Sequence, residues 1–292
     1  MPMLSGITYL LKSNFAVFKA LRRAMAFFGY FKHRLGKTPD AHWRERITTV
    51  LSAPDNADIA RVPGAGDVVG DCQVMHNGVR IHLGSYYGDG MTSLLFENKG
   101  VHEPQEEKAF AEVLRHLPPK PAMLELGAFW GFYSLTFRKS FPEGQSYLIE
   151  PDRHALQSGK HNFRLNNLHG KFFNYYVSDR PAPGKIPVTT VDEFLNTNNI
   201  SKLHVLHSDI QGFESKMLRG AESSLREARI DFIFISTHSN SLHEECKQFL
   251  SALSYIIVCD ADLDESFSED GLIVAKHKNV RGPERINIHL RK

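Results

Sequence analysis

A short stretch at residues 125–131, ELGAFWG, combines a carboxylate with two glycines. Glycines in a turn between a strand and a helix let the backbone approach a ligand that side chains would block. Their G-x-x-x-G spacing differs from the G-x-G-x-x-G of dinucleotide-binding turns, and a carboxylate disfavours a phosphate but suits an ammonium group. The stretch therefore predicts S-adenosylmethionine rather than NAD, held by Glu125, Gly127, Ala128 and Gly131. A packing turn with an incidental acid is the alternative.

Two more acidic residues follow the next two predicted strands. Glu150 lies 25 residues after Glu125, where a carboxylate can accept hydrogen bonds from both hydroxyls of a ribose. Asp179 follows the third predicted strand, and its carboxylate can accept a hydrogen bond from the amino group of an adenine. We predict that both residues contact the cofactor, although a solvated loop aspartate explains Asp179 nearly as well.

Imidazole and carboxylate side chains stand at the ends of two later predicted strands. Strand alternation places His207 and Asp209 on the same side of one strand, and His238 ends its neighbour. Such groups form a general base with its orienting partner, or ligands for a divalent metal such as Mg or Mn. Either arrangement fits the deprotonation of a hydroxyl. We predict His207, Asp209 and His238 as catalytic residues and as alternative metal ligands, against buried structural histidines.

Strand and helix patterns alternate from about residue 106 to the end of the chain. The predicted strands are 122–126, 146–149, 171–177, 204–208, 231–236, 255–259 and 272–275, and the predicted helices are 106–117, 133–138, 153–166, 191–196, 213–228 and 242–253. Continuous apolar strands separated by helices predict a doubly wound α/β domain with a parallel sheet covered on both faces. In such a sheet ligands bind at the carboxyl ends of the strands, where all the candidate residues lie.

Three sequence blocks are specific enough to indicate a family. VTTVDEFL at 188–195, DIQGFE at 209–214 and LRGA at 218–221 resemble the FkbM family of S-adenosylmethionine-dependent O-methyltransferases, and the resemblance extends over roughly residues 85–276. It implies a class I methyltransferase fold with seven strands, the last of them antiparallel. It also implies cofactor contacts at Glu125, Gly127, Gly131 and Glu150, and methyl transfer to a hydroxyl of a sugar, glycan or related natural product.

The chain departs from the common pattern of that family at three positions. The usual Asp-Val-Glu-Gly reads DIQG at 209–212, and the position that usually holds Lys is His207. Roles of the family's Glu and Lys therefore do not transfer, and metal assistance through Asp209 and His238 gains weight. Two other classes of function stay open: a nucleic-acid methyltransferase, and a cofactor-binding structural subunit without turnover.

The N-terminal third divides into two predicted segments before the cofactor domain. Residues 1–66 predict a basic amphipathic helix and a linker, residues 67–105 a hairpin or lid segment, and residues 106–292 the S-adenosylmethionine-binding domain. Asn77-Gly78 between alternating runs is a hairpin signal. Residues 86–89 are interpreted as a hairpin tip, and residues 102–106 as a helix entry.

Charge is concentrated at the N-terminus. Residues 1–37 contain seven basic and no acidic residues, with apolar residues at helical spacing between residues 7 and 28. Such a helix packs on its own domain or in a homodimer, or it lies as a peripheral helix on an anionic membrane. No module that reads bases is recognisable, so we expect no nucleic-acid partner.

The overall composition is that of an ordinary globular protein. The 292 residues are 42% hydrophobic and 23% charged, which excludes disorder as the main state. The three cysteines lie far apart, so we expect neither a disulfide framework nor a zinc ribbon. No apolar run reaches the roughly 18 residues of a membrane span. We expect a soluble, cytoplasmic protein with the possibility of membrane-peripheral contact.

Overall fold

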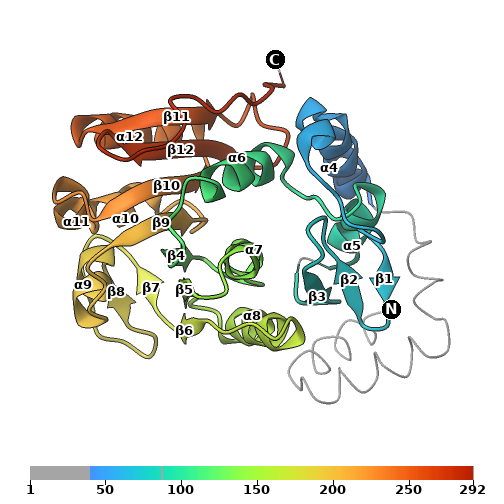
Figure 1. The fold of residues 1–292 in the computed structure, drawn as a ribbon, viewed down its shortest axis with the longest axis horizontal. Coiled ribbons are helices and arrows are strands. Elements are labelled where there is room, and N and C mark those ends of the chain that lie inside the picture. The colour runs from blue at the N-terminus through green and yellow to red at the C-terminus, as the bar shows by residue number, and fades with distance from the viewer. Residues whose placement is uncertain (1–39, 87, 292) are drawn as a thin grey trace.

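The computed structural model describes residues 40–86 and 88–291. The helix predicted between residues 7 and 28 lies outside the described residues, so its membrane or subunit contacts stay predictions. In the described part of the chain, no helix is both long and apolar enough to cross a membrane. Figure 1 shows a large sheet with helices on its two faces and, across from it, helices α4 and α5 with strands β1 to β3.

A seven-stranded sheet forms the larger part, with the order β11-β12-β10-β9-β4-β5-β6. From β10 to β6 each strand pairs with its neighbours in parallel, whereas β12 is antiparallel to both β10 and β11. The predicted doubly wound class I methyltransferase sheet, with its last strand antiparallel, is therefore confirmed. The strands are β4 (Ala122–Leu126), β5 (Gln145–Ile149), β6 (Lys171–Phe173), β9 (Leu203–Ser208), β10 (Ile230–Thr237), β11 (Tyr255–Ala261) and β12 (Gly271–His277).

Each strand supplies alternate residues to two separate cores because successive side chains point to opposite faces. Phe234 packs with the helices of one face and Ile233 with those of the other. The first face is covered by α6 (Pro104–Leu114), α7 (Phe132–Ser140) and α8 (Arg153–Leu165), as Figure 1 shows. The second face is covered by α9 (Val191–Thr197), α10 (Glu214–Arg219), α11 (Glu222–Arg226) and α12 (Asn240–Ala252).

Two predicted elements are each divided in the structure. The strand predicted at 171–177 becomes β6 and β7 (Tyr176–Val177), and β7 pairs with β8 (Val188–Thr189) in a separate sheet. Between them the amide of Asn174 donates to the carbonyls of Glu150 and Pro151, at 2.9 and 2.7 Å, which takes the chain out of the large sheet. The helix predicted at 213–228 becomes α10 and α11, which meet around Gly220.

The residues before α6 form a second, smaller unit, which we call the N-terminal lobe (residues 40–86 and 88–103). It contains α4 (Ala41–Ser52), a 3-10 turn η1 (Pro54–Asp58), β1 (Val68–Val69), β2 (Cys72–Val74), β3 (Arg80–His82) and α5 (Gly88–Glu97). The predicted hairpin is confirmed, because β2 and β3 pair as antiparallel strands. The hairpin tip predicted at 86–89 is wrong from Gly88 onward, where α5 begins. Its apolar Met91, Leu94 and Leu95 recur at helical spacing and are buried.

A buried carboxylate on α6 joins the lobe to the sheet domain. Oε1 of Glu107 lies 2.7 Å from Nδ1 of His102, and Oε2 lies 3.0 Å from Nε2 of His76. Burial alone would raise the pKa of Glu107, but the two imidazoles outweigh it and hold the pKa well below its ordinary value. On the other side of the lobe, Asn162 of α8 accepts the backbone N–H of His82 at 3.0 Å.

We predict that Glu107→Gln destabilises the fold by about 3–5 kcal/mol, because the two buried imidazoles lose their anion. The depressed pKa of Glu107 means that its contribution is complete above the ordinary value of 4.5 and is lost as the pH falls below it. Urea unfolding between pH 3 and 7 should therefore show a flatter acid dependence in the variant. Glu112→Gln, at a more exposed position of the same helix, is the control, and equal effects of the two substitutions would contradict the prediction.

Candidate functional site

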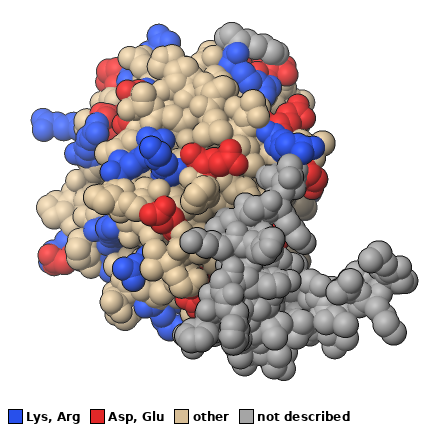
Figure 2. Space-filling view, turned by 90° about the vertical axis from the view of Figure 1, so that its right-hand side faces the viewer, with Lys and Arg blue, Asp and Glu red and all other residues tan. Residues whose placement is uncertain are grey.

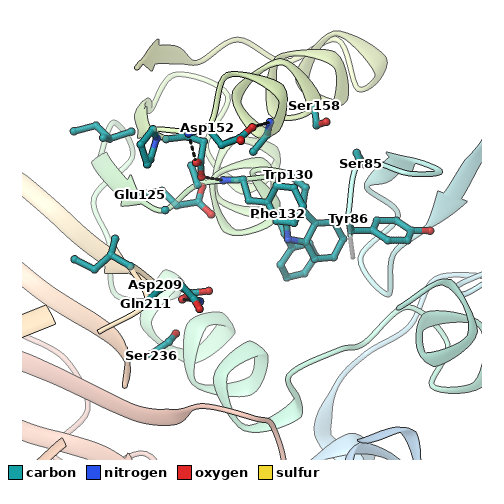
Figure 3. A pocket seen from close by; sticks show the side chains of 18 of the residues that line it. Ser85, Tyr86, Glu125, Trp130, Phe132, Asp152, Ser158, Asp209, Gln211 and Ser236 are labelled. Carbon is teal, nitrogen blue, oxygen red and sulfur yellow. Dashed lines mark hydrogen bonds between the residues drawn. The ribbon is translucent and has the colours of Figure 1, made fainter. Parts of the chain in front are cut away.

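A groove of about 1910 Å³ lies at the carboxyl ends of the strands, between the sheet and the N-terminal lobe. Figure 3 shows Glu125 and Asp209 on one side of it, Trp130 and Phe132 next to them, and Tyr86 of the lobe beyond. Of the residues predicted from the sequence, six line this groove: Glu125, Gly127, Ala128, Glu150, His207 and Asp209. Gly131, Asp179 and His238 do not line it, and each of them holds a neighbouring position described below.

Two turns meet at the floor of the groove. Gly127 has a φ of +69°, and a Cβ at this position would lie 1.7 Å from the carbonyl oxygen of Asp209. The N–H of Asp209 in turn donates to the carbonyl of Leu126 at 3.1 Å. Gly131, with a φ of +73°, precedes the first turn of α7. The glycines predicted from the sequence are therefore required by close backbone approach and by left-handed conformation.

The carboxylate of Glu125 rests on the start of α7. Its Oε2 accepts the backbone N–H of Ser134 at 3.0 Å, and the residue is 3% exposed. Burial raises the pKa of Glu125, while the neighbouring His207 acts in the opposite direction. Figure 3 shows the carboxylate turned toward the groove. It can therefore accept hydrogen bonds from a cationic ligand group while helix α7 fixes its orientation.

Glu150 organises the turn on the other side of the groove. Its Oε2 accepts the N–H of Phe129 at 3.0 Å, and its Oε1 accepts the N–H of Asp152 at 2.8 Å. Burial raises the pKa of Glu150, and these two backbone hydrogen bonds oppose the shift. Each carboxylate oxygen has a second lone pair, so Glu150 keeps the capacity to accept two hydroxyl hydrogens.

Asp179 does not line the groove. Its Oδ1 accepts a hydrogen bond from Oγ of Ser178 at 3.0 Å, which lowers the pKa of Asp179. Ser178 and Arg180, on either side of it in the chain, line the groove instead. The adenine contact of Asp179 stays a prediction.

His238 is surrounded by three carboxylates at the other end of the groove. Its Nδ1 lies 2.8 Å from Oε1 of Glu214, and its Nε2 lies 3.3 Å from Oδ1 of both Asp209 and Asp270. Burial would lower the pKa of His238, but hydrogen bonds to Asp209 and Glu214 and the charge of Asp270 raise it to about 10. The imidazole is therefore a cation at neutral pH. Its Nδ1 donates a hydrogen bond to Glu214, and its Nε2 forms ion pairs with Asp209 and Asp270.

The same cluster has the donor set of a metal site. Ligand atoms of Asp209, His238 and Asp270 all lie within 4.8 Å of one another, and this is the one such group among the described residues. Glu214 holds the remaining ring nitrogen of His238, as carboxylates do behind metal-ligating histidines. Neither Glu214 nor Asp270 was predicted from the sequence as a site residue. Glu214 lies in the DIQGFE block, so a signal existed, whereas nothing in the sequence distinguishes Asp270.

His207 lies apart from this cluster. Its Nε2 lies 2.7 Å from Oε1 of Glu106, and its ring stands 4.1 Å from that of Tyr133. Burial would lower the pKa of His207, but Glu106, Glu125 and Asp209 together raise it. Its Nδ1 is buried and has no hydrogen-bond partner among the described residues. The sequence analysis missed Glu106, which lies 101 positions away on α6.

Comparison with known families finds a match for the part of the chain that contains β9, β10 and β11. Residues 178–262 match the family model described as "Methyltransferase FkbM domain". The match confirms the resemblance drawn from the sequence blocks. None of the curated proteins matches the chain.

Comparison with solved structures finds several similar chains. TrmK of M. capricolum, bound to S-adenosyl-homocysteine, is 11% identical with a TM-score of 0.43 over 59% of this chain and 69% of that one. A precorrin-6y C5,15-methyltransferase from Geobacter metallireducens is 13% identical with a TM-score of 0.43, over 60% and 89% of the two chains. A ribosomal protein L11 methylase from Lactobacillus delbrueckii is 11% identical with a TM-score of 0.43, over 62% and 82%. Similarity at this level says nothing about the reaction or the substrate.

We predict that Gly127→Ala costs substantially more stability than Gly70→Ala. Both glycines have positive φ, +69° and +64°, so both substitutions carry roughly 1–2 kcal/mol of backbone strain. Only at Gly127 does the new Cβ meet another atom, the carbonyl oxygen of Asp209, since nothing lies within 4 Å at Gly70. Urea unfolding should show an additional loss of about 1–3 kcal/mol for Gly127→Ala. Equal losses would mean that the two turns separate freely.

Proposed function

We propose that this chain, which carries the FkbM methyltransferase match at residues 178–262, binds S-adenosylmethionine in the groove and methylates a hydroxyl of a sugar, glycan or related natural product. One observation carries the proposal. The cofactor-type residues Glu125, Gly127 and Glu150 line the same groove as Asp209, whose carboxylate is paired with the His238 imidazolium. A binding turn and a proton-accepting group therefore face one space.

The residues that we assign to the cofactor suit different parts of that molecule. Glu125 suits the ammonium group of the cofactor, and Glu150 suits its ribose hydroxyls. The backbone of residues 127–131 lies between the two carboxylates, where no side chain of Gly127 obstructs a ligand. Ser178 and Arg180 continue the same wall toward the expected position of the adenine ring.

Residues of this chain take up the proton of the acceptor hydroxyl. The bound cofactor supplies an electrophilic methyl group, and most of the rate acceleration then comes from positioning the acceptor oxygen in line with it. Asp209 accepts the proton of the acceptor hydroxyl as the new O–C bond forms and the bond between the methyl group and the cofactor's sulfur breaks, which leaves S-adenosylhomocysteine. His238 keeps its own proton, forms an ion pair with Asp209 and is itself oriented by its hydrogen bond to Glu214. His238 thus acts as a positioning residue, in place of the base that its sequence position predicts.

Metal assistance is the alternative within the same site. A Mg or Mn ion between Asp209, His238 and Asp270 would replace the proton on the imidazole and lower the pKa of the acceptor hydroxyl. The three ligand atoms fit such an ion in type and in spacing. His207 lies outside this group of three residues. We therefore propose that His207 does not bind the metal and only neighbours Glu125 and Asp209.

The distribution of surface charges gives less support to a nucleic-acid acceptor. Figure 2 shows Lys and Arg side chains interspersed with Asp and Glu over the described part of one face. A protein that binds nucleic acid typically gathers its basic residues into one patch or stripe. We therefore propose a small or carbohydrate acceptor in preference to a nucleic acid.

We predict that Glu150→Gln weakens binding of S-adenosylmethionine and S-adenosylhomocysteine at least about tenfold, or ~1.4 kcal/mol. An amide can accept only one of the two backbone N–H groups of Phe129 and Asp152, so the ribose-binding turn loses its support. Isothermal titration calorimetry measures both affinities, with Glu143→Gln at the surface as control. Absence of binding to the unmodified protein would overturn the proposed cofactor, and unchanged binding to Glu150→Gln would overturn this role of Glu150.

We predict that Asp209→Asn lowers turnover by roughly 10²–10⁴-fold, because an amide cannot take up the proton, and leaves cofactor affinity within about threefold. Formation of S-adenosylhomocysteine with a panel of sugars measures turnover, and Asp264→Asn, outside the groove, is the control. Each assay is repeated with a chelator and with added Mg or Mn. Activity that a chelator abolishes and the metal restores would select the metal-assisted alternative. Equal loss of turnover and cofactor affinity would place Asp209 on the cofactor instead.

A further inference from the structure

Helix α4 of the N-terminal lobe forms part of the groove wall. His42, Trp43 and Arg46, one turn of the helix, line the groove together with His102 and Glu103. Arg46 forms an ion pair with Glu269, the residue before Asp270, which places it at the end of the groove that we assign to the acceptor. The sequence predicted this helix only as part of a linker. The end of the groove that we assign to the acceptor therefore contains side chains that have no role in the proposed methyl transfer.

Arg46 forms an ion pair across the groove with the loop before β12. Its Nη1 donates to Oε2 of Glu269 at 2.6 Å, and Oε1 of the same carboxylate lies 2.9 Å from Nε2 of His42. The side chain of Arg46 is 11% exposed, and its Nε is buried with no hydrogen-bond partner among the described residues. A buried polar group left without a partner destabilises the protein. A ligand oxygen at this point would remove that destabilisation.

Trp43 is held in a fixed position beside this ion pair. A Cβ on Gly90 of α5 would lie 2.1 Å from the indole ring, so the ring rests directly on the backbone of that glycine. The guanidinium carbon of Arg46 lies 5.0 Å from the ring centroid. An indole ring, a guanidinium and a carboxylate therefore stand together on one wall, and each is oriented by another part of the protein.

The charges at this end disfavour an anionic ligand. Glu103, Asp209, Glu269 and Asp270 all line the groove, and Glu103 and Asp209 both repel Asp270. The basic side chains on this wall are already paired with carboxylates. Arg46 and His42 both pair with Glu269, and His102 pairs with Glu107. A phosphate group here would meet more carboxylates than free cations. A neutral ligand with several hydroxyls can instead donate to the carboxylates and accept from Arg46.

We propose that Trp43, Arg46 and Glu269 form an acceptor-binding subsite for a neutral sugar ring, with the indole against the ring and the Arg46–Glu269 pair bonded to adjacent hydroxyls. The inference deepens the proposed function and rests on it. It assigns acceptor specificity to the N-terminal lobe and cofactor binding to the sheet domain. It also excludes sugar phosphates and nucleic acids as the preferred acceptors.

Calorimetric titration with a panel of neutral methyl glycosides tests the subsite on the full chain saturated with S-adenosylhomocysteine. We expect at least one hexoside, deoxyhexoside or pentoside to bind, and Arg46→Lys to weaken it about tenfold or more, because lysine keeps the charge but loses the planar fork. Arg44→Lys, an exposed arginine on the same helix, is the matched control and should bind as the unmodified protein does. The corresponding sugar phosphates should bind more weakly. Failure of every neutral glycoside, or tighter binding of the phosphates, would overturn the subsite.

The two tryptophans separate this inference from the proposed function. Trp43 and Trp130 are the only tryptophans of the chain, and both line the groove. In Trp130→Phe the remaining Trp43 should change its fluorescence with neutral glycosides, and in Trp43→Phe the remaining Trp130 should respond to S-adenosylmethionine. A cofactor response without a glycoside response overturns the subsite alone. A glycoside response with no cofactor binding by calorimetry overturns the proposed function and leaves the subsite standing.

Discussion

The site depends on the close contact of two turns, one after β4 and one after β9. The backbone at Gly127 lies so near the carbonyl of Asp209 that even a methyl group would overlap it. The N–H of Asp209 bonds back to Leu126, so neither turn can move without the other. This contact places the turn that we assign to the cofactor directly against the residue that we assign to the acceptor's proton. Methyl transfer needs this proximity, since misplacement by about 1 Å costs rate heavily.

Buried carboxylates paired with imidazoles recur around this contact. Glu214 holds His238, Glu106 holds His207, and Glu107 holds His102. Each pair carries a desolvation cost that good geometry only partly offsets, so such pairs contribute more to orientation than to net stability. In all three pairs the carboxylate belongs to a helix, α6 or α10, and fixes a ring on another segment. The helices that cover the sheet thereby set the directions of the polar groups at its edge.

The sequence predicted the parts of the site that follow local rules. Strand ends and glycine spacing located Glu125, Gly127, Glu150 and Asp209, because the carboxyl ends of parallel strands meet at one edge. It could not locate Glu106, Asp270 or Arg46, since tertiary packing brings these residues to the groove from distant segments of unremarkable sequence. Helix α5 was missed for a different reason. Its first turn contains two glycines, which favour a turn in local sequence, and burial of Leu94 and Leu95 outweighs that preference.

The roles that we propose divide between the sheet and the lobe. The residues that we assign to the cofactor lie on strand ends whose positions are fixed by hydrogen bonds within the sheet. The α4 residues reach the same groove from a lobe that is attached through side chains, among them the Glu107 cluster and the Arg46–Glu269 pair. Substitutions in α4 can therefore change which acceptor fits without disturbing the strand ends. If the proposed roles hold, a change of acceptor would need substitutions in α4 only, and the residues that we assign to the cofactor and to the acceptor's proton would stay the same.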